Sequence, residues 1–302
     1  MSTKRMLIVI VLLLTLTPLI VTASHTLNDI INTPNFNYAV NYTNDSPYNP
    51  AAPQPGDDTN YMPDAQAQNM AHALIHTLAA VAGNPNGNHT GFTNLGFRAP
   101  DFGGTPRNVM TFDCSQHGGC DSGNAPADRI NMPATGYIQA TEPCIRLVIG
   151  HELFHHVQYA YITFNKWSAW GNMPVEGTAR MMQDKLYTDL DGNAGCITYR
   201  GQVNSFLGNP NQTIWNASYS SALFWSYLAE QLGTTAGEPS IGVDFIERFW
   251  ENARNNNASP DVPANMRRKI NDFDVNETLE NIFHDFTIAN VAKDLDVSAL
   301  ND

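Results

Sequence analysis

Two histidines four residues apart, with a glutamate directly after the first, occur in the segment "GHELFHHVQYAY" at residues 150–161. An α-helix has about 3.6 residues per turn, so His151 and His155 would share one face with Glu152 close beside them. The rest of the segment is mostly apolar or aromatic, which predicts a buried helix. Buried imidazole and carboxylate groups need a partner that offsets their desolvation. This H-E-x-x-H spacing supplies two zinc ligands and a carboxylate for general base catalysis.

A catalytic zinc site needs a third protein ligand and one open position. A histidine six residues after His155 would complete one known pattern, but that position is Tyr161. A second pattern takes a glutamate from a following helix, and Glu176 follows His155 after 20 intervening residues. Asp184 lies two turns later on the same face and is the alternative ligand. If Glu176 is the ligand, we expect Asp184 to contact a ligand or Arg180.

The elements that position these residues can be inferred from the periodicity of the chain. Apolar spacing typical of helices predicts helical segments at 64–83, 144–164, 174–189, 218–233, 241–255 and 276–296. Short alternating runs predict strands in "FNYAVNY", "NVMTF" and "TGYIQA", all of which precede the helix that carries the histidines. The sequence therefore predicts an α+β fold, in which a strand-rich N-terminal half packs on a helical C-terminal half with the H-E-x-x-H helix between them.

The first 23 residues have the order of a secretory signal peptide, in which basic residues precede an apolar run and small residues at a cleavage site. The apolar run is shorter than the roughly 20 residues that an uncleaved membrane anchor needs. We therefore expect a secreted protein without membrane association after cleavage. The predicted organisation is a signal peptide (1–23), a polar N-terminal segment (24–63) and a catalytic domain (64–302).

The charge of the chain restricts its partners. Asp and Glu number 29 against 16 Lys and Arg, which gives a formal net charge of −13. Binding to phosphate backbones needs a basic surface, and the sequence has no basic cluster that would form one. Nucleic acid is therefore not expected as a partner.

Four cysteines in an exported chain predict two disulfide bonds. Cys144 begins the H-E-x-x-H helix, and Cys196 follows the helix that carries Glu176, so convergence of the two helices would bring these cysteines into one region. Cys114 and Cys120 are separated only by "SQHGG", which can close locally. The pairings Cys144–Cys196 and Cys114–Cys120 are therefore favoured over the crossed ones.

The segments "HELFHHVQYAY", "PVEGTARMMQD" and "YSSALFWSYLAEQLG" resemble the gluzincins, the thermolysin-like H-E-x-x-H…E metallopeptidases. More narrowly, they are similar to secreted bacterial zinc metalloproteases with the pattern H-E-x-x-H-x-x-Q followed by W-x-x-E-G-x-A. The resemblance implies a zincin-like fold and hydrolysis of protein or peptide substrates. It also implies one catalytic Zn²⁺ bound by His151, His155 and Glu176, with Glu152 as general base. Tyr219 is the candidate that stabilises the oxyanion, because gluzincins often supply such a donor from a later helix.

Three alternatives remain open. The first is a catalytically inactive binding module of zincin fold. It is considered because the chain departs from the pattern after Glu176, where Met181, Met182, Gln183 and Asp184 replace the usual Trp and acidic pair. A zinc hydrolase acting on a non-peptide substrate is another. The third concerns "DLDGNAG" at 189–195, which is similar to a Ca²⁺-binding loop but lacks the later bidentate glutamate, so that a simple turn is favoured over Ca²⁺.

Overall fold

The computed structural model describes residues 24–33, 36–43, 66, 91–98, 110–111, 130–131, 141–163, 166–190, 196, 198–209, 211–255 and 261–292. Four sequence predictions fall largely or wholly outside these ranges: the signal peptide, the helix at 64–83, the strand "TGYIQA" and the Cys114–Cys120 disulfide. None of the helices within the described ranges is long and apolar enough to span a membrane.

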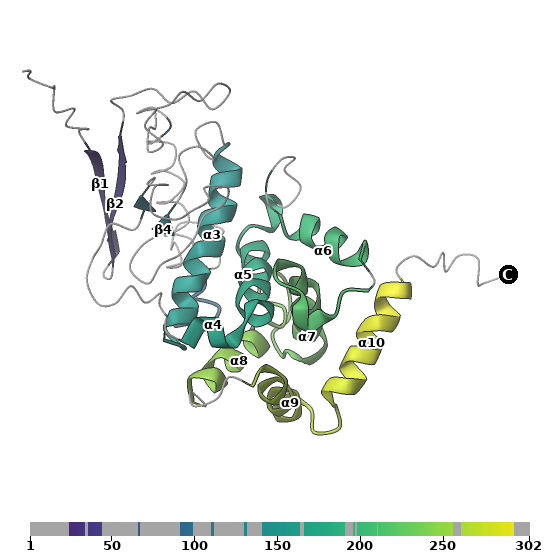
Figure 1. Ribbon diagram of the computed structural model, residues 1–302. Helices are drawn as coiled ribbons and strands as arrows, with labels where there is room; N and C mark the ends of the chain where they lie inside the picture. The colour runs from purple at the N-terminus through teal and green to yellow at the C-terminus, as the bar shows by residue number, and fades with distance from the viewer. Residues whose placement is uncertain are drawn as a thin grey trace, which may run out of the picture.

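Helices make up most of the described chain (Figure 1). The α-helices are α3 (Glu142–Tyr159), α4 (Trp167–Trp170), α5 (Asn172–Leu186), α6 (Tyr199–Leu207), α7 (Ala222–Leu232), α8 (Val243–Asn255), α9 (Val262–Phe273) and α10 (Leu279–Ala292). Three short 3-10 helices are η2 (Thr188–Leu190), η3 (Ile214–Asn216) and η4 (Tyr219–Ser221). The five helices predicted after residue 143 are all present, with ends shifted by a few residues.

The predicted α+β fold with a strand-rich N-terminal half is wrong for the residues that the structure describes. The strands are β1 (Ser24–Thr33), β2 (Phe36–Thr43), β3 (Met110–Thr111) and β4 (Ile130–Asn131), in the order β1-β2-β3-β4. Only the antiparallel β1–β2 pair is longer than two residues. The predicted strand "FNYAVNY" lies in β2, whereas of "NVMTF" the structure describes only Met110 and Thr111, which form β3. A short alternating run shows that one face could be buried, but it does not specify a pairing partner.

Two helices that the sequence did not predict, α6 and α9, bury few side chains completely. Helix α6 has no buried residue, and α9 buries only Asn265, Met266 and Ile270. Local signals nevertheless mark the start of α9, where the Asp261 side chain accepts a hydrogen bond from the Ala264 N–H at 2.9 Å. Both helices also pack apolar residues at helical spacing on the core: Tyr199, Val203 and Phe206 from α6, and Val262, Met266, Ile270 and Phe273 from α9. The pattern was therefore present in the sequence but was not recognised.

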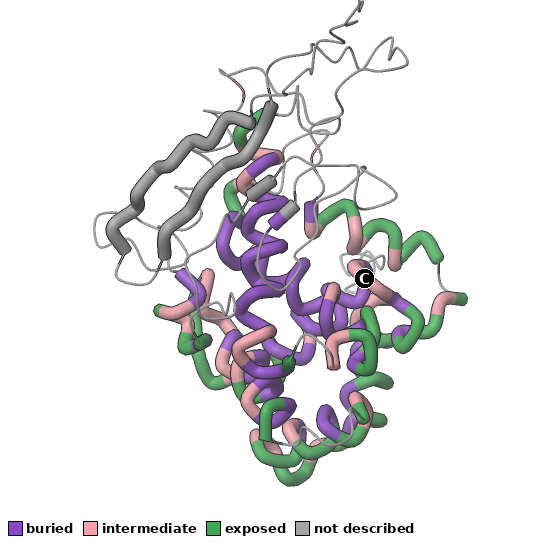
Figure 2. Tube along the Cα trace, turned by 60° about the vertical axis from the view of Figure 1, so that its left-hand side comes forward, coloured by how far each residue is buried: buried purple, intermediate pink, exposed green. Residues whose placement is uncertain are grey.

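Helix α3 lies in the core and is buried along nearly its whole length (Figure 2). Its neighbour α5 packs along it (Figure 1), and the side chains of Leu186 and Tyr187 lie close to Gly150. An added Cβ on Gly150 would lie 3.3 Å from Leu186 Cδ2 and 3.5 Å from the ring of Tyr187. On another side of α3, the ring of Phe154 packs edge-on against Phe92 and Phe97 at centroid distances of 5.1 and 5.2 Å. The nearly uniform apolar surface of α3 is thus covered from several directions.

The predicted disulfide between Cys144 and Cys196 is confirmed, with a Cα–Cα distance of 4.9 Å. It joins the first turn of α3 to the segment between η2 and α6. The two helices that carry the predicted metal ligands are therefore part of one covalently closed loop.

Candidate metal centre

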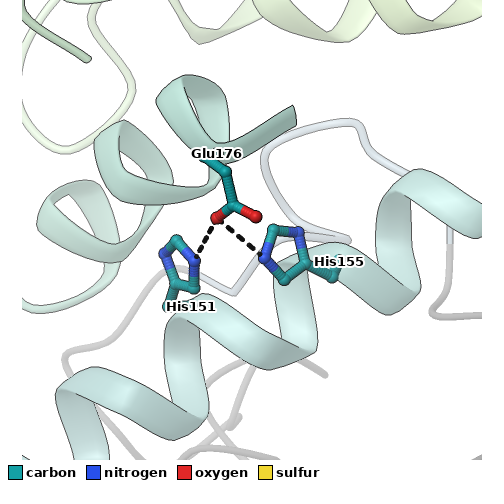
Figure 3. Close-up of side chains that lie close together, drawn as sticks. All are labelled: His151, His155 and Glu176. Carbon is teal, nitrogen blue, oxygen red and sulfur yellow. Dashed lines mark hydrogen bonds and ion pairs between the residues drawn. The ribbon is translucent and has the colours of Figure 1, made fainter. Parts of the chain in front are cut away.

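Helices α3 and α5 bring the three predicted ligands together (Figure 3). His151 and His155 project from successive turns of α3, and Glu176 faces them from the first turns of α5. Glu176 Oε2 lies 3.1 Å from His151 Nε2 and 3.4 Å from His155 Nε2. The possible ligand atoms of the three residues all lie within 4.8 Å of one another. This is the spacing of side chains that can share one metal ion.

The surroundings of His151 and Glu176 favour the protonation states in which these side chains bind metal. Burial, together with the positive charge of Arg180, lowers the pKa of His151 to about 3. Burial alone would raise the pKa of Glu176, but the charge of His155 and hydrogen bonds from both histidines hold it below its ordinary value. Neutral imidazole and ionised carboxylate are the forms that bind metal.

The pKa of His155 is shifted in the opposite direction to that of His151. Burial lowers its pKa, but the charge and hydrogen bond of Glu176, the charge of Glu152 and the hydrogen bond of Gln158 together outweigh burial, so the pKa is raised overall. A proton on His155 would be displaced when metal binds, because a metal ligand must offer its lone pair. Two imidazole nitrogens and one carboxylate oxygen that lie within 4.8 Å of one another therefore fit a divalent metal ion.

Glu152 lies among these groups without being one of the three ligands. It is 5% exposed, and burial raises its pKa to about 7. The positive charges of His155 and Arg180 oppose this rise, whereas the negative charge of Glu176 adds to it. The pKa of this buried carboxyl group therefore responds to the charges of the ligand side chains, as is common for residues of functional sites.

Tyr219 lies on the His151 side of the cluster. It begins the 3-10 helix η4 and not the predicted longer helix, which starts three residues later as α7. Its half-buried ring is 5.5 Å from the ring of His151, and the guanidinium carbon of Arg180 is 5.2 Å from its centroid. Burial, together with the charges of Glu176 and Glu152, raises the pKa of Tyr219, so its hydroxyl keeps the proton that it could donate.

Close contact of η4 and α7 with α5 places Tyr219 beside His151. The Ser221 hydroxyl and the Trp225 indole N–H both donate to the backbone oxygen of Met173, at 2.7 and 2.9 Å. Gly177 makes this approach possible, because an added Cβ would lie 2.0 Å from Ser221 Oγ and 2.8 Å from Trp225 Cδ1. The glycine directly after Glu176 thus allows η4 and α7 to reach the metal centre.

Asp184, the alternative third ligand, does not belong to the cluster. It is half-buried on α5, two turns beyond Glu176. Within the described ranges, His151, His155 and Glu176 are the only group of His, Cys, Asp or Glu side chains arranged to hold a metal ion. Of the suggested Ca²⁺ loop, residues 191–195 lie outside the described part of the chain.

Two contacts of His155 were not recognised from the sequence. Its Nδ1 is hydrogen-bonded to Gln158 Oε1 at 2.9 Å, and its ring packs against Trp167 at a centroid distance of 4.5 Å. Trp167 in turn packs against Tyr159 at 4.8 Å. The contact with Gln158 could have been predicted, because Gln158 is a polar residue in an apolar helix and follows His155 by three positions. Nothing in the local pattern distinguished Trp167 from a core aromatic.

The sequence matches no protein-family model and no curated protein, and the fold matches no solved structure. The likeness to gluzincins therefore depends on the motifs quoted above. The geometry and chemistry of the metal centre itself are the remaining guide to function.

Proposed function

We propose that this protein is a secreted, zinc-dependent metallopeptidase of the gluzincin type. The observation that carries the proposal is the convergence of His151, His155 and Glu176 on one point, with a buried Glu152 beside them that is not a ligand. Two imidazoles and one carboxylate are the ligand set of thermolysin-like catalytic zinc. A purely structural zinc site would more often use four ligands, with cysteine among them.

The protein groups would divide the chemistry between them. Zinc held by His151, His155 and Glu176 would polarise a scissile carbonyl and lower the pKa of water to about 7. Glu152 would take the proton of the attacking water and deliver it to the leaving amine. The Tyr219 hydroxyl would donate a hydrogen bond to the carbonyl oxygen as negative charge develops there.

The site is also enclosed in the way that such chemistry needs. His151 and His155 are each 3% exposed, whereas 15% of the Glu176 side chain is exposed, so the cluster is open to solvent mainly beside the carboxylate. Exclusion of water strengthens electrostatic interactions inside the site. The half-buried rings of Trp167 and Tyr219, next to His155 and His151, are candidate contacts for a peptide substrate.

Secretion is supported by the apolar start of the chain and by the Cys144–Cys196 bond. Structural disulfides persist in oxidising compartments and are rare in a reducing cytosol.

The test measures metal content and peptidase activity on the same purified protein. We expect about one zinc per chain by elemental analysis, and cleavage of casein that stops with a chelator and returns with zinc. Zinc without cleavage would instead support the inactive binding module, and a protein that binds no zinc would refute the proposal. Cleavage of a non-peptide ester but not of casein would indicate the other kind of zinc hydrolase.

A further inference from the structure

We infer that the hydrogen bonds among Gln158, Thr178 and Trp250, here called the relay, hold the His155 ring in the orientation and tautomer that bind metal. Among the described residues, His151 Nδ1 has no equivalent hydrogen bond. The inference rests on the metal centre of the proposed function but not on peptide hydrolysis. It concerns positioning residues, because none of the three would touch the metal or the substrate.

The relay begins with the orientation of the Gln158 amide. Its Nε2 donates to the backbone oxygen of Val175 at 2.9 Å and to Thr178 Oγ1 at 3.0 Å, which uses both of its hydrogens. A backbone carbonyl can only accept, so the amide nitrogen must face Val175 and the amide oxygen must face His155. That oxygen can only accept as well, and it lies 2.9 Å from His155 Nδ1. Nδ1 therefore carries the proton, and Nε2, which faces Glu176, is left as the metal-binding nitrogen.

Thr178 holds the amide in this orientation. Its hydroxyl donates to the backbone oxygen of Pro174 at 2.7 Å, and accepts from Gln158 Nε2 and from the Trp250 indole N–H at 3.2 Å. One donated and two accepted bonds satisfy a hydroxyl completely. Gln158, Thr178 and Trp250 are all fully buried, so water cannot replace a lost bond without rearrangement.

The relay also couples the ligands to each other. Gln158 belongs to α3, Thr178 to α5 and Trp250 to α8, so three helices contribute. Val175, which accepts from Gln158, directly precedes Glu176 in the chain. The same amide that orients His155 therefore fixes the backbone next to the third ligand.

His151 differs in this respect. Among the residues that the structure describes, its buried Nδ1 has no hydrogen-bond partner. Metal-binding histidines usually donate this second nitrogen to a carboxylate, carbonyl or water, which fixes the ring and its tautomer. The two histidines therefore differ in how their rings are held in the absence of metal. The His155 ring is fixed by the hydrogen bond of its Nδ1 to Gln158, whereas the His151 ring is held, within the described residues, by packing and by Glu176.

The first test compares zinc affinities by competition with a chelator. Gln158→Met and Thr178→Val keep the side-chain volume but remove the hydrogen bonds, and each should weaken zinc binding about 10–100-fold. Thr178→Ser keeps the hydroxyl and should restore most of the affinity. Trp250→Phe removes one bond at the far end of the relay and should have the smallest effect.

A matched control separates positioning from general stability. Asn265→Leu removes another buried amide bond, the 2.8 Å contact from Asn252 Nδ2 to Asn265 Oδ1 between α8 and α9. It should lower stability while leaving zinc affinity unchanged. If Gln158→Met does not fold, the comparison of Thr178→Val with Thr178→Ser still decides the question.

The second test observes the histidine proton directly. In zinc-loaded protein with ¹⁵N-labelled histidine, NMR should show a proton on His155 Nδ1 that exchanges slowly with solvent, and Thr178→Val should accelerate this exchange. Unchanged exchange, together with unchanged zinc affinity in Gln158→Met and Thr178→Val, would overturn the relay while leaving the metal centre intact. Failure of the unaltered protein to bind zinc would instead refute the metal centre, and with it the proposed function.

Discussion

Glu152 is a buried carboxylate and Glu176 a partly buried one in the same site, and their surroundings move their pKa values in opposite directions. Burial dominates at Glu152 and raises its pKa to about 7, whereas contacts with two histidines lower the pKa of Glu176. Two carboxyl groups whose surroundings shift their pKa values in opposite directions can serve different chemical roles. Glu176 is suited to remain ionised as a ligand, and Glu152 is suited to exchange a proton.

The substitution Glu152→Gln should preserve the fold and zinc content but reduce turnover by roughly 10²–10⁴-fold or more, because the amide cannot accept the proton of water. Casein cleavage and elemental analysis of the same sample measure both quantities. Near-native cleavage by this variant would show that Glu152 is not the general base.

Glu176→Ala should weaken zinc binding severely, because it removes a ligand and the negative charge that balances the metal. Asp184→Ala is the matched control on the same helix, and it should weaken binding much less, since Asp184 is not part of the cluster. Chelator competition measures both affinities. Equal losses, or a larger loss for Asp184→Ala, would mean that the third ligand is misassigned.

At the scale of the elements, the position of η4 and α7 depends on close approach to α5 at Gly177. Gly177→Ala should destabilise the protein by about 1–3 kcal/mol or more, because the new methyl group would overlap Ser221 Oγ and Trp225. Urea unfolding measures this, and peptidase activity should fall with it as Tyr219 moves.

Gly201→Ala is the control for helix propensity. Gly201 lies within α6, and its added Cβ would meet only Thr198 Oγ1, at an ordinary 3.5 Å. Alanine there should stabilise by roughly 0.5–1 kcal/mol. If Gly177→Ala were equally stabilising, the close approach at that position would be wrong.

The start of α8 is fixed by a carboxylate. Asp244 accepts hydrogen bonds from the backbone N–H and hydroxyl groups of both Thr234 and Thr235, with the shortest at 2.6 Å from Thr234 Oγ1. Partial burial would raise the pKa of Asp244, but these bonds outweigh it and hold the pKa below its ordinary value. The ionised form therefore ties the end of α7 to α8.

The sign of the pH dependence follows from this lowered pKa. Asp244 contributes stability above its unfolded pKa of about 3.9, and the contribution is lost as the pH falls through the lower folded value. Asp244→Asn should lower the free energy of unfolding by roughly 1–2 kcal/mol at pH 7. The difference between the two proteins should shrink below about pH 4. A difference in urea midpoint that stays constant from pH 7 to pH 2.5 would contradict this assignment.

For the molecule as a whole, the Cys144–Cys196 bond closes a loop that contains all three metal ligands, with 52 residues of sequence separation. In the chain-entropy model, a loop of this length stabilises by roughly 4 kcal/mol. Replacing both cysteines with serine should therefore lower the melting temperature and weaken zinc binding, because the bond ties the start of α3 to the segment after α5. Added zinc should recover part of the lost stability, since it binds only the folded state. A variant with unchanged melting temperature and zinc affinity would show that packing alone holds the two helices.

Several features of this protein could be determined from local spacing alone. His151, Glu152 and His155 share a face because the period of one helix places them there, and no distant contact is needed. The five helices predicted after residue 143 could be recognised for the same reason, because each contains apolar residues at helical spacing. The Cys144–Cys196 pairing required one further step, the inference that α3 and α5 converge, and the structure confirms that pairing.

Other features were decided only by tertiary structure. A strand needs a pairing partner that its own sequence does not specify. The run "FNYAVNY" does form β2, but within the described residues the predicted strand-rich half is not present. The choice between Glu176 and Asp184 depended on how α5 packs against α3, because both residues belong to α5 and lie about two turns apart. The contact of Trp250 with Thr178 joins residues 72 positions apart, so only the packing of α8 against α5 could reveal that the support of His155 extends so far. Local periodicity specifies which face of a helix is apolar, whereas the identity of the neighbour follows from the simultaneous packing of all helices around one core.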